Sequence, residues 1–308
     1  MVKKKHHYIP VFYLKGFTDT ASGSCLWVYN KNGEKIFAST PKGIAYENDY
    51  FSFIDKSGGK DSESFENWIA GVENATSRTI NKICSRDILT IEEKKSFAIF
   101  VAMMLLRTPN SRKNIEDMYA QMRKQQSIHL ASNRKAFESM IERYQQKTGQ
   151  NISVDIEELR KSIINFDEHF TITVETLASL QMIIPLMQDL ASVFWRMKWV
   201  FLKTKGDHKF LTGDNPLSYG TPNLIYPVGL GHVDIQVTLP LSKEIAAFGS
   251  WQLREDCKYV QASNQDVKGI NRNTVISAHR FVFASKKSET LKRLVKKYQN
   301  TAPKISIS

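Results

Sequence analysis

The sequence predicts an α+β fold in which N-terminal and C-terminal β segments enclose a central helical block. Three observations predict this fold class. Short, aromatic-rich β candidates occupy residues 1–60. From about residue 61 apolar residues recur at three- and four-residue steps, as on one face of a helix. Alternating apolar residues then return after residue 198. No internal repeat interrupts this order.

A β-hairpin is expected near the N-terminus. The runs 26–29 and 36–38 flank Asn32-Gly33, and Asn-Gly between two aromatic-rich runs is a strong hairpin signal. Residues 50–53 form a further short β candidate.

The helical block should contain a long, buried helix. Thr90 and Glu93 form a capping-box pattern, and the helix that they open is apolar on nearly every side through Leu106. Pro109 disfavours α geometry in the residue before it, so this helix should end or kink there.

Two further helical regions follow. Residues 111–150 are polar and helical in pattern, and a second helical run spans roughly 155–196 with an interruption expected at Pro185. We therefore predict a single α+β domain over residues 1–285 with a helical insertion at about 111–160.

The C-terminal β segments are expected at 199–202, 210–212, 233–239, 245–248 and 281–284, with a helix near 263–278. The tail 286–308 carries seven Lys or Arg and one Glu. One face of it carries Leu291, Leu294, Val295 and Tyr298, so we predict a basic amphipathic helix. This helix could bind phosphate or an anionic membrane surface, or it could be a solvated surface helix that only packs its leucines.

Composition narrows the class of partner. The net charge of +12 and the pI near 9.4 favour nucleic acid first and a membrane surface second, although many basic proteins are merely soluble. The three scattered cysteines form neither a metal pattern nor a disulfide framework, which fits a reducing cytoplasm. The longest apolar run, 97–106, is too short for a membrane span, and no signal peptide is recognised.

The His6-His7 pair is the most specific local feature. Imidazole titrates near neutral pH and can exchange protons or bind metal. The apolar residues that follow, Phe12 to Phe17, should dock this terminus into the protein. Because adjacent strand side chains point to opposite faces, we expect one histidine to face the core or a site and the other the surface.

Four other positions could carry chemistry, each with a structural alternative. Asp214 and Asn215 end a β segment and could bind a cation or orient a histidine, or Asp214 could only cap backbone amides. Arg107 and Arg112 suit phosphate recognition or a helix terminus. Glu73, beside an apolar stripe, suits a working site or a structural ion pair with an arginine.

No strong enzyme motif is present in the sequence. There is no phosphate-binding loop, dinucleotide fingerprint, nucleophile elbow, zincin helix or zinc-finger spacing.

The chain nevertheless resembles the uncharacterised family numbered 4238 among the domains of unknown function. The resemblance covers roughly residues 5–285 and is specific as a set. It rests on His6-His7-Tyr8-Ile9-Pro10, Tyr13-Leu14, Phe17, Trp27, Tyr29, Asn48-Asp49-Tyr50, Glu73, Arg107-Thr108-Pro109, Arg112, Gly213-Asp214-Asn215-Pro216 and Asn271. Gly213 stands where the family has serine. The resemblance implies no established chemistry, but it implies a bacterial accessory gene acting in anti-phage defence.

The residues in this set contain the parts for phosphodiester cleavage if one pocket gathers them. We therefore expect a defence nuclease acting on RNA or DNA. The expected catalytic residues are His6, His7, Glu73 and Asp214. The residues expected to bind phosphate or substrate are Tyr13, Arg107, Arg112 and Asn215. His7, Glu73 and Asp214 are also candidate ligands for Mg²⁺ or Mn²⁺.

Two other functions stay open. The first is a non-catalytic sensor or toxin that binds a phage or host component, in which the polar residues form a structural core network. The second is nucleotide or ADP-ribose chemistry, for which no fingerprint exists. Homo-oligomerisation, with residues 111–160 as an arm, also stays open.

Overall fold

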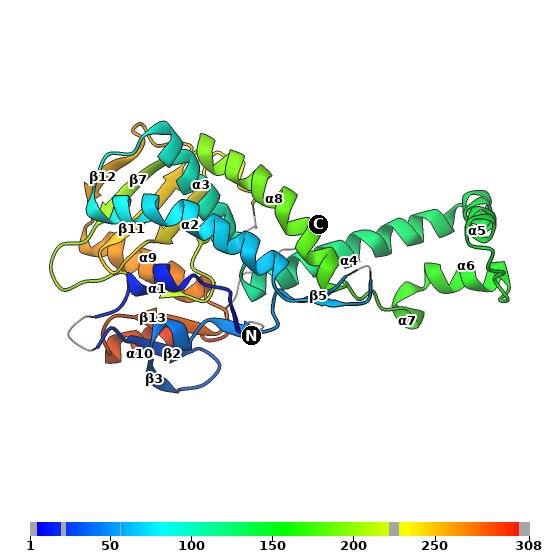
Figure 1. Ribbon diagram of the computed structural model, residues 1–308, viewed down its shortest axis with the longest axis horizontal. Helices are drawn as coiled ribbons and strands as arrows, with labels where there is room; N and C mark the ends of the chain where they lie inside the picture. The colour runs from blue at the N-terminus through cyan, green and yellow to red at the C-terminus, as the bar shows by residue number, and fades with distance from the viewer. Residues whose placement is uncertain (1–4, 20–22, 56, 222–227, 302–308) are drawn as a thin grey trace. The chain divides into compact units, whose positions relative to one another are not determined.

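The computed structural model describes residues 5–19, 23–55, 57–221 and 228–301 (Figure 1). The chain divides into two compact units. We call residues 1–112 with 176–305 the sheet unit, and residues 113–175 the helical unit. The mixed α+β class with a central helical block is confirmed.

The N-terminal segment folds into the sheet unit. Strand β1 (Lys5–His7) pairs antiparallel with β4 (Tyr46–Asn48), and the short helix α1 (Val11–Lys15) follows. The Tyr13 ring packs against Phe17 and Phe100 at centroid distances of 5.2 and 6.0 Å. The expected docking of this terminus is confirmed, because Tyr13 and Phe17 are almost fully buried.

Three helices form the central block of the sheet unit. They are α2 (Ser64–Ser85), α3 (Ile91–Leu106) and α8 (Thr176–Arg196). The capping box of Thr90 and Glu93 is present, and α3 ends before Arg107, as predicted. Helix α8 packs against α3 and continues through Pro185, where an interruption was expected. By length and composition α8 could cross a membrane, with 28% of its apolar window buried.

The larger sheet has the strand order β12-β7-β11-β10-β9. Its strands are β7 (Lys198–Lys203), β9 (Ser218–Gly220), β10 (Gln236–Pro240), β11 (Ile245–Ser250) and β12 (Lys258–Gln261). All neighbours are antiparallel except β12 and β7. On one face, Trp199 and Phe201 of β7 pack edge-on against Phe97 of α3. Helix α9 (Asn264–Ser277) packs Val267 and Ile270 against the opposite face.

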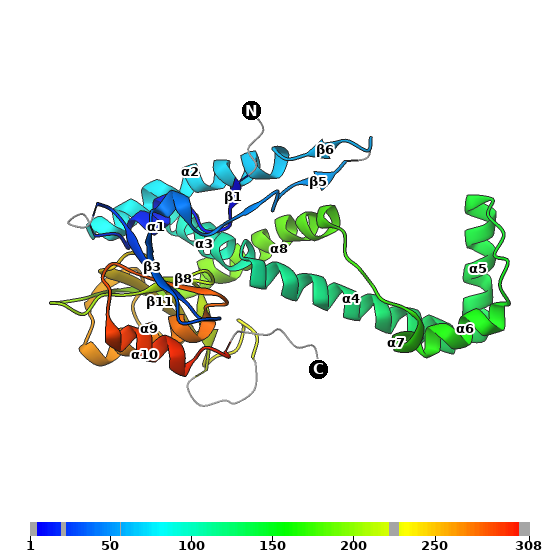
Figure 2. The same cartoon turned by 90° about the horizontal axis from the view of Figure 1, so that it is seen from below.

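The second sheet has the order β3-β2-β13-β8. Its strands are β2 (Leu26–Asn30), β3 (Ile36–Ser39), β8 (Thr212–Gly213) and β13 (Phe281–Ala284). The predicted hairpin is therefore present as β2 and β3. The basic tail forms α10 (Glu289–Lys297), which packs Leu291 and Val295 into a core shared with α9 and this sheet. Figure 2 shows α9 and α10 side by side.

Small elements complete the sheet unit. They are a 3₁₀ turn at Pro41–Gly43 and the two-residue strands β5 (Phe53–Ile54) and β6 (Lys60–Asp61). The β candidate at 50–53 is thus reduced to its last residue. Residues 222–227, and residues 302–308 of the predicted basic tail, lie outside the described residues.

The helical unit has its own small core. Its helices are α4 (Pro109–Ser132, whose first turn belongs to the sheet unit), α5 (Arg134–Thr148), α6 (Ile156–Ile164) and α7 (Phe166–His169). Ala131, Phe137 and Ile141 are buried together, and Ile152, Leu159 and Ile163 pack around them. The expected helical run at 155–196 is interrupted at 170–175, which is not helical.

Candidate functional site

The histidine pair points to opposite faces of β1, as predicted. His6 is fully buried, and its Nδ1 accepts a hydrogen bond from the backbone N–H of Phe51 at 2.8 Å. Its ring also stacks on the Phe51 ring. Because Nδ1 accepts, the proton of the neutral imidazole is on Nε2. His6 therefore holds the N-terminal strand to the residue 49–52 turn.

His7 is only partly buried. Its Nε2 lies 3.3 Å from the carbonyl oxygen of Lys42, and its ring meets the edge of Tyr46. Donation from Nε2 to that carbonyl leaves Nδ1 as an acceptor. Burial, together with the nearby charges of Arg107 and Lys5, lowers the pKa of His7 below its usual value. The imidazole is thus neutral at pH 7 and has a lone pair available.

Arg107 joins three elements at the end of α3. One Nη donates to Glu73 Oε1 on α2 at 2.7 Å, and the other donates to the backbone oxygen of His7 at 2.6 Å. The Arg107 side chain is 2% exposed and that of Glu73 is 24% exposed. Both charges are consequently engaged in an ion pair that fastens β1 to the helices. Arg107 is not an open phosphate clamp in this arrangement.

Arg112 performs a similar task one turn further on. It donates to the backbone oxygen of Tyr50 at 2.6 Å, and its guanidinium lies 5.1 Å from the centre of the Tyr50 ring. The residue 49–52 turn is therefore held by His6 on one side and Arg112 on the other.

Asp214 is buried and accepts three backbone N–H groups. Its Oδ1 receives the N–H of His279 at 2.8 Å, and its Oδ2 receives those of Arg280 at 2.7 Å and Phe281 at 2.9 Å. Burial raises the pKa of this carboxyl, and the three N–H groups act in the opposite direction. Both oxygens are occupied, and they fix the corner between α9 and β13.

Asn215 and Tyr13 tie neighbouring parts of the same corner. Asn215 Nδ2 donates to the backbone oxygen of Ser277 at 3.0 Å, and its Oδ1 accepts from Thr108 at 3.4 Å. The Tyr13 hydroxyl donates to the Pro240 oxygen at 2.6 Å and meets Thr212 Oγ1 at 2.7 Å. Tyr13 is fully buried, which raises its pKa. Neither side chain is presented to a ligand.

Gly213 is closely surrounded. A Cβ at this position would lie 3.0 Å from Ala278 Cβ and 3.1 Å from the Phe281 oxygen. Glycine here lets β8 approach the α9 to β13 corner that Asp214 fixes.

Sequence reasoning missed Lys31, which completes this corner. Its Nζ donates to the carbonyl oxygens of Ala278 and Thr301 at 2.6 Å and of Val275 at 2.7 Å. A cation at the C-terminus of α9 complements the helix dipole, while burial lowers the pKa of Lys31 to about 8. A lysine in a hairpin turn carries no sequence signal for such burial.

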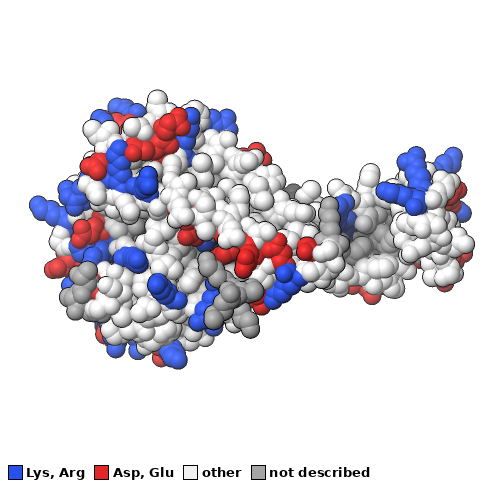
Figure 3. All heavy atoms as spheres, viewed as in Figure 1, with Lys and Arg blue, Asp and Glu red and all other residues white. Residues whose placement is uncertain are grey.

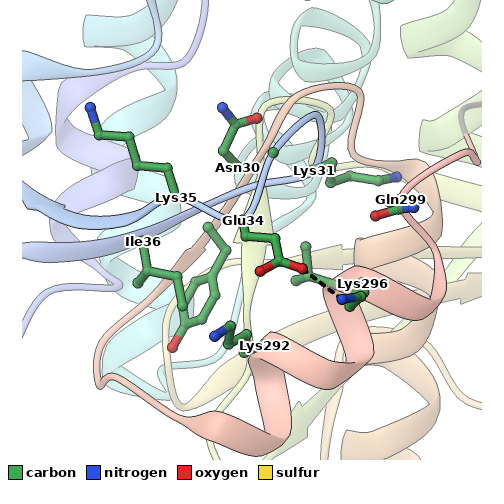
Figure 4. Close-up of a pocket in the computed structure, with 11 residues that line it drawn as sticks. Asn30, Lys31, Glu34, Lys35, Ile36, Lys292, Lys296 and Gln299 are labelled. Atoms are coloured by element: carbon green, nitrogen blue, oxygen red, sulfur yellow. Dashed lines mark hydrogen bonds and ion pairs between the residues drawn. The ribbon is translucent and has the colours of Figure 1, made fainter.

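Figure 4 shows the surroundings of Lys31. The side chain points away from the Glu34–Lys296 ion pair, which joins the β2–β3 turn to α10 at 2.6 Å. The pocket between these elements has a volume of only about 30 Å³, which is room for a water molecule. We therefore assign it a structural role.

The predicted site residues thus form two polar networks. The first contains His6, His7, Glu73, Arg107 and Arg112 around β1, and the second contains Tyr13, Asp214 and Asn215 around the α9 to β13 corner. Among the described residues, no three or more His, Cys, Asp or Glu side chains gather as a metal site. Of the candidate ligands for Mg²⁺ or Mn²⁺, His7 and Glu73 belong to the first network, whereas Asp214 belongs to the second.

A different surface carries the exposed charge. A groove of about 920 Å³ lies between α9, α10 and residues 207–211, and we call it the α9–α10 groove. Six Lys or Arg and one acid, Asp207, line it. The basic residues are Lys209, Lys268, Arg272, Lys286, Arg293 and Lys297. On the face drawn in Figure 3, by contrast, basic and acidic side chains are interspersed.

Five of these six cations have no ion-pair partner among the described residues, although Lys297 Nζ lies 5.5 Å from the centre of the Tyr298 ring. Lys209 pairs with Glu244, but the other five make no ion pair with any residue in the described ranges. All five are exposed. Asn271, between them, bridges the backbone at Lys209 and Leu211 and so fixes one wall of the groove.

The fold and these networks define an α+β protein with a rigid polar frame and a basic groove. A family model described as protein of unknown function (DUF4238) matches residues 5–288. The chain belongs to this family. No curated protein and no solved structure matches the chain.

Proposed function

We propose that this protein binds nucleic acid in the α9–α10 groove and that it contacts the phosphate backbone of the nucleic acid there. One observation carries the proposal: five exposed cations without ion pairs line one groove that contains a single acid. Lys and Arg that face phosphate supply the sequence-independent part of nucleic-acid affinity. The net charge of +12 adds a favourable long-range field.

The helices place these cations in register. Lys268 and Arg272 are four residues apart on α9, and Arg293 and Lys297 are four apart on α10. Residues at this spacing lie on the same face of a helix, so each helix presents a pair of charges to the groove. Two facing pairs suit a strand of phosphates better than one isolated anion.

The polar networks support a non-catalytic role. His6, Tyr13, Asp214 and Asn215 are buried and hold backbone groups, as a structural network would. We propose that the protein acts as a nucleic-acid-binding sensor or toxin in bacterial anti-phage defence. The defence setting rests on the family resemblance alone.

Fluorescence anisotropy with labelled oligonucleotides tests the proposal. The double variant Lys268→Glu/Arg272→Glu should weaken binding at least about tenfold, because it reverses two phosphate-facing charges. Its matched control is Arg143→Glu/Lys147→Glu, a pair of exposed residues at the same helical spacing on α5. Equal weakening by both variants, or no binding by the wild type, would refute the groove as the site.

A nuclease is the second candidate, and His7 is the observation that favours it. This imidazole is partly exposed and neutral at pH 7, and Nδ1 is free to accept a proton. The Glu73–Arg107 pair lies beside it. In this proposal His7 is the general base, and Arg107 holds its backbone in place.

Cleavage assays separate the two candidates. Wild type, His7→Gln and Asp214→Ala are incubated with RNA and plasmid DNA, with and without Mg²⁺ or Mn²⁺, and their melting temperatures are recorded. Cleavage that is lost in a well-folded His7→Gln variant supports a nuclease. Absence of cleavage by the wild type removes this candidate and leaves the binding function.

A further inference from the structure

The α9–α10 groove has two chemically different parts. Five of the basic lining side chains are exposed and we call them the rim, whereas the lining residues beneath them are buried and mostly apolar and we call them the floor. Leu211, Ala284 and Leu291 of the floor are buried and belong to the core between α9 and α10. Leu294 and Tyr298 extend this floor and are half-buried. A phosphate backbone can form ion pairs with the rim, but it gains nothing from contact with the apolar floor.

We propose that the groove binds single-stranded nucleic acid, with phosphates on the rim and unstacked bases on the floor. This inference rests on the proposed nucleic-acid binding. Single strands expose base faces that stack on apolar and aromatic side chains, whereas a duplex keeps those faces inside its own stack. The groove volume, about 920 Å³, is at the upper end of ligand clefts of roughly 300–1,000 Å³. A groove of this size admits a short run of unstacked bases.

Gly269 supports a use for the open floor. It lies within α9 between the rim residues Lys268 and Arg272, and a Cβ built on it meets no atom within 4 Å. Packing therefore does not require glycine there. Glycine within a helix is less favourable than alanine, because it loses more conformational freedom on folding. We attribute this glycine to the groove, because any larger side chain at this position would project into it.

Gly269 also supplies the test. Gly269→Phe fills the groove without removing a charge, and Gly269→Ala is the matched control that adds one methyl group. Binding is measured by anisotropy with a labelled oligonucleotide of about 12 nucleotides, as a single strand and as a duplex. Circular dichroism checks that both variants fold.

We expect the wild type to bind the single strand at least about tenfold tighter than the duplex, because stacking contributes on this scale per base. Gly269→Phe should abolish that preference, and Gly269→Ala should retain it. If the duplex binds as tightly as the single strand, or if Gly269→Phe leaves single-strand binding unchanged, the inference fails while the proposed binding function stands.

Two further outcomes would overturn the proposed nucleic-acid binding as well. No binding of either nucleic acid defeats the proposed function itself. Co-sedimentation with phosphatidylserine vesicles that is lost in Lys268→Glu/Arg272→Glu, without nucleic-acid binding, overturns both in favour of a lipid surface.

Discussion

At the residue scale, Asp214 uses its charge to hold backbone. Three N–H groups of residues 279–281 converge on its two oxygens within a buried corner. These donors offset part of the cost of burying the carboxylate, although burial has the larger effect and raises its pKa. A structural role, in which the carboxylate holds the backbone of residues 279–281, therefore accounts for the aspartate at position 214.

The first prediction concerns this residue. Asp214→Asn should destabilise the protein by about 2–4 kcal/mol, because an amide replaces one accepting oxygen with a donor that faces N–H groups. Urea unfolding measures the loss. Asp189→Asn on the exposed face of α8 is the control and should change stability little. A stable Asp214→Asn variant would mean that the carboxylate does not hold this corner.

The second prediction concerns His7 and pH. Its pKa in the folded protein lies below its unfolded value near 6.5, so the unfolded chain takes up this proton first as the pH falls. Stability contributed by neutral His7 is therefore present above pH 6.5 and is lost as the pH falls from 6.5 toward the folded pKa. Urea midpoints between about pH 5 and pH 8 measure this slope.

His7→Gln should flatten that slope, since glutamine cannot titrate. His169→Gln, in the helical unit, is the matched control and should leave the slope unchanged. Identical pH profiles for the wild type and His7→Gln would show that His7 is not the group responsible.

Residue patterns predicted contacts within one element better than contacts between elements. The capping box at Thr90 and the opposite orientations of His6 and His7 follow from local geometry, and both are present. The partners of Asp214 lie 65–67 residues away, and no spacing rule announces them. The sequence indicates Arg107 and Glu73 as separate candidates, and the structure contains the structural alternative for Glu73, an ion pair with an arginine.

At the element scale, α9 connects the two sheets. It packs Val267 and Ile270 against the larger sheet and Val275 against the core of the smaller one. Its C-terminus is closed by Lys31 from the β2–β3 turn, and its exposed face forms one wall of the groove. The position of this helix therefore couples the polar corner to the groove.

The third prediction follows for Lys31. Lys31→Met should destabilise the protein by about 2–4 kcal/mol, because two buried carbonyl oxygens and the partly buried one of Thr301 lose their donor. Hydrogen exchange should also accelerate in α10, whose C-terminal segment Lys31 holds through Thr301. Lys35→Met, at an exposed position of the same turn, is the control. Unchanged exchange in α10 would contradict the proposed coupling.

The strands illustrate the limit of sequence patterns at this scale. Alternation at 233–239 predicted the strand that is present as β10, but this strand begins at Gln236 and its last four residues are all buried. No local pattern predicts Gly249 in β11, because the opposite strand determines the space there. A Cβ at Gly249 would lie 2.8 Å from the Trp199 ring, its directly paired neighbour on β7. The register that brings the two together is a tertiary property.

At the scale of the whole molecule, charge and cores are distributed unequally. The groove gathers six of the basic residues around a single acid in the sheet unit, and the helical unit has a separate core around Phe137. The sequence predicted the tail's charge and helix, but only the fold brings that helix beside α9. The pairing of the two basic helix faces could not be derived from either segment alone.

The fourth prediction tests whether the two units unfold separately. Phe137 is 1% exposed in a core of few residues, and Phe→Ala substitutions cost about 3–5 kcal/mol. Phe137→Ala should therefore accelerate amide exchange across residues 113–175 and leave the strands of the sheet unit protected. Tyr144→Ala on the exposed side of α5 is the control.

Because the groove lies within the sheet unit, the oligonucleotide affinity of Phe137→Ala should stay within about twofold of wild type, a change too small to indicate a lost contact. Equal acceleration in both units would instead show that the chain unfolds as one cooperative body, with the helical core contributing to the stability of the groove.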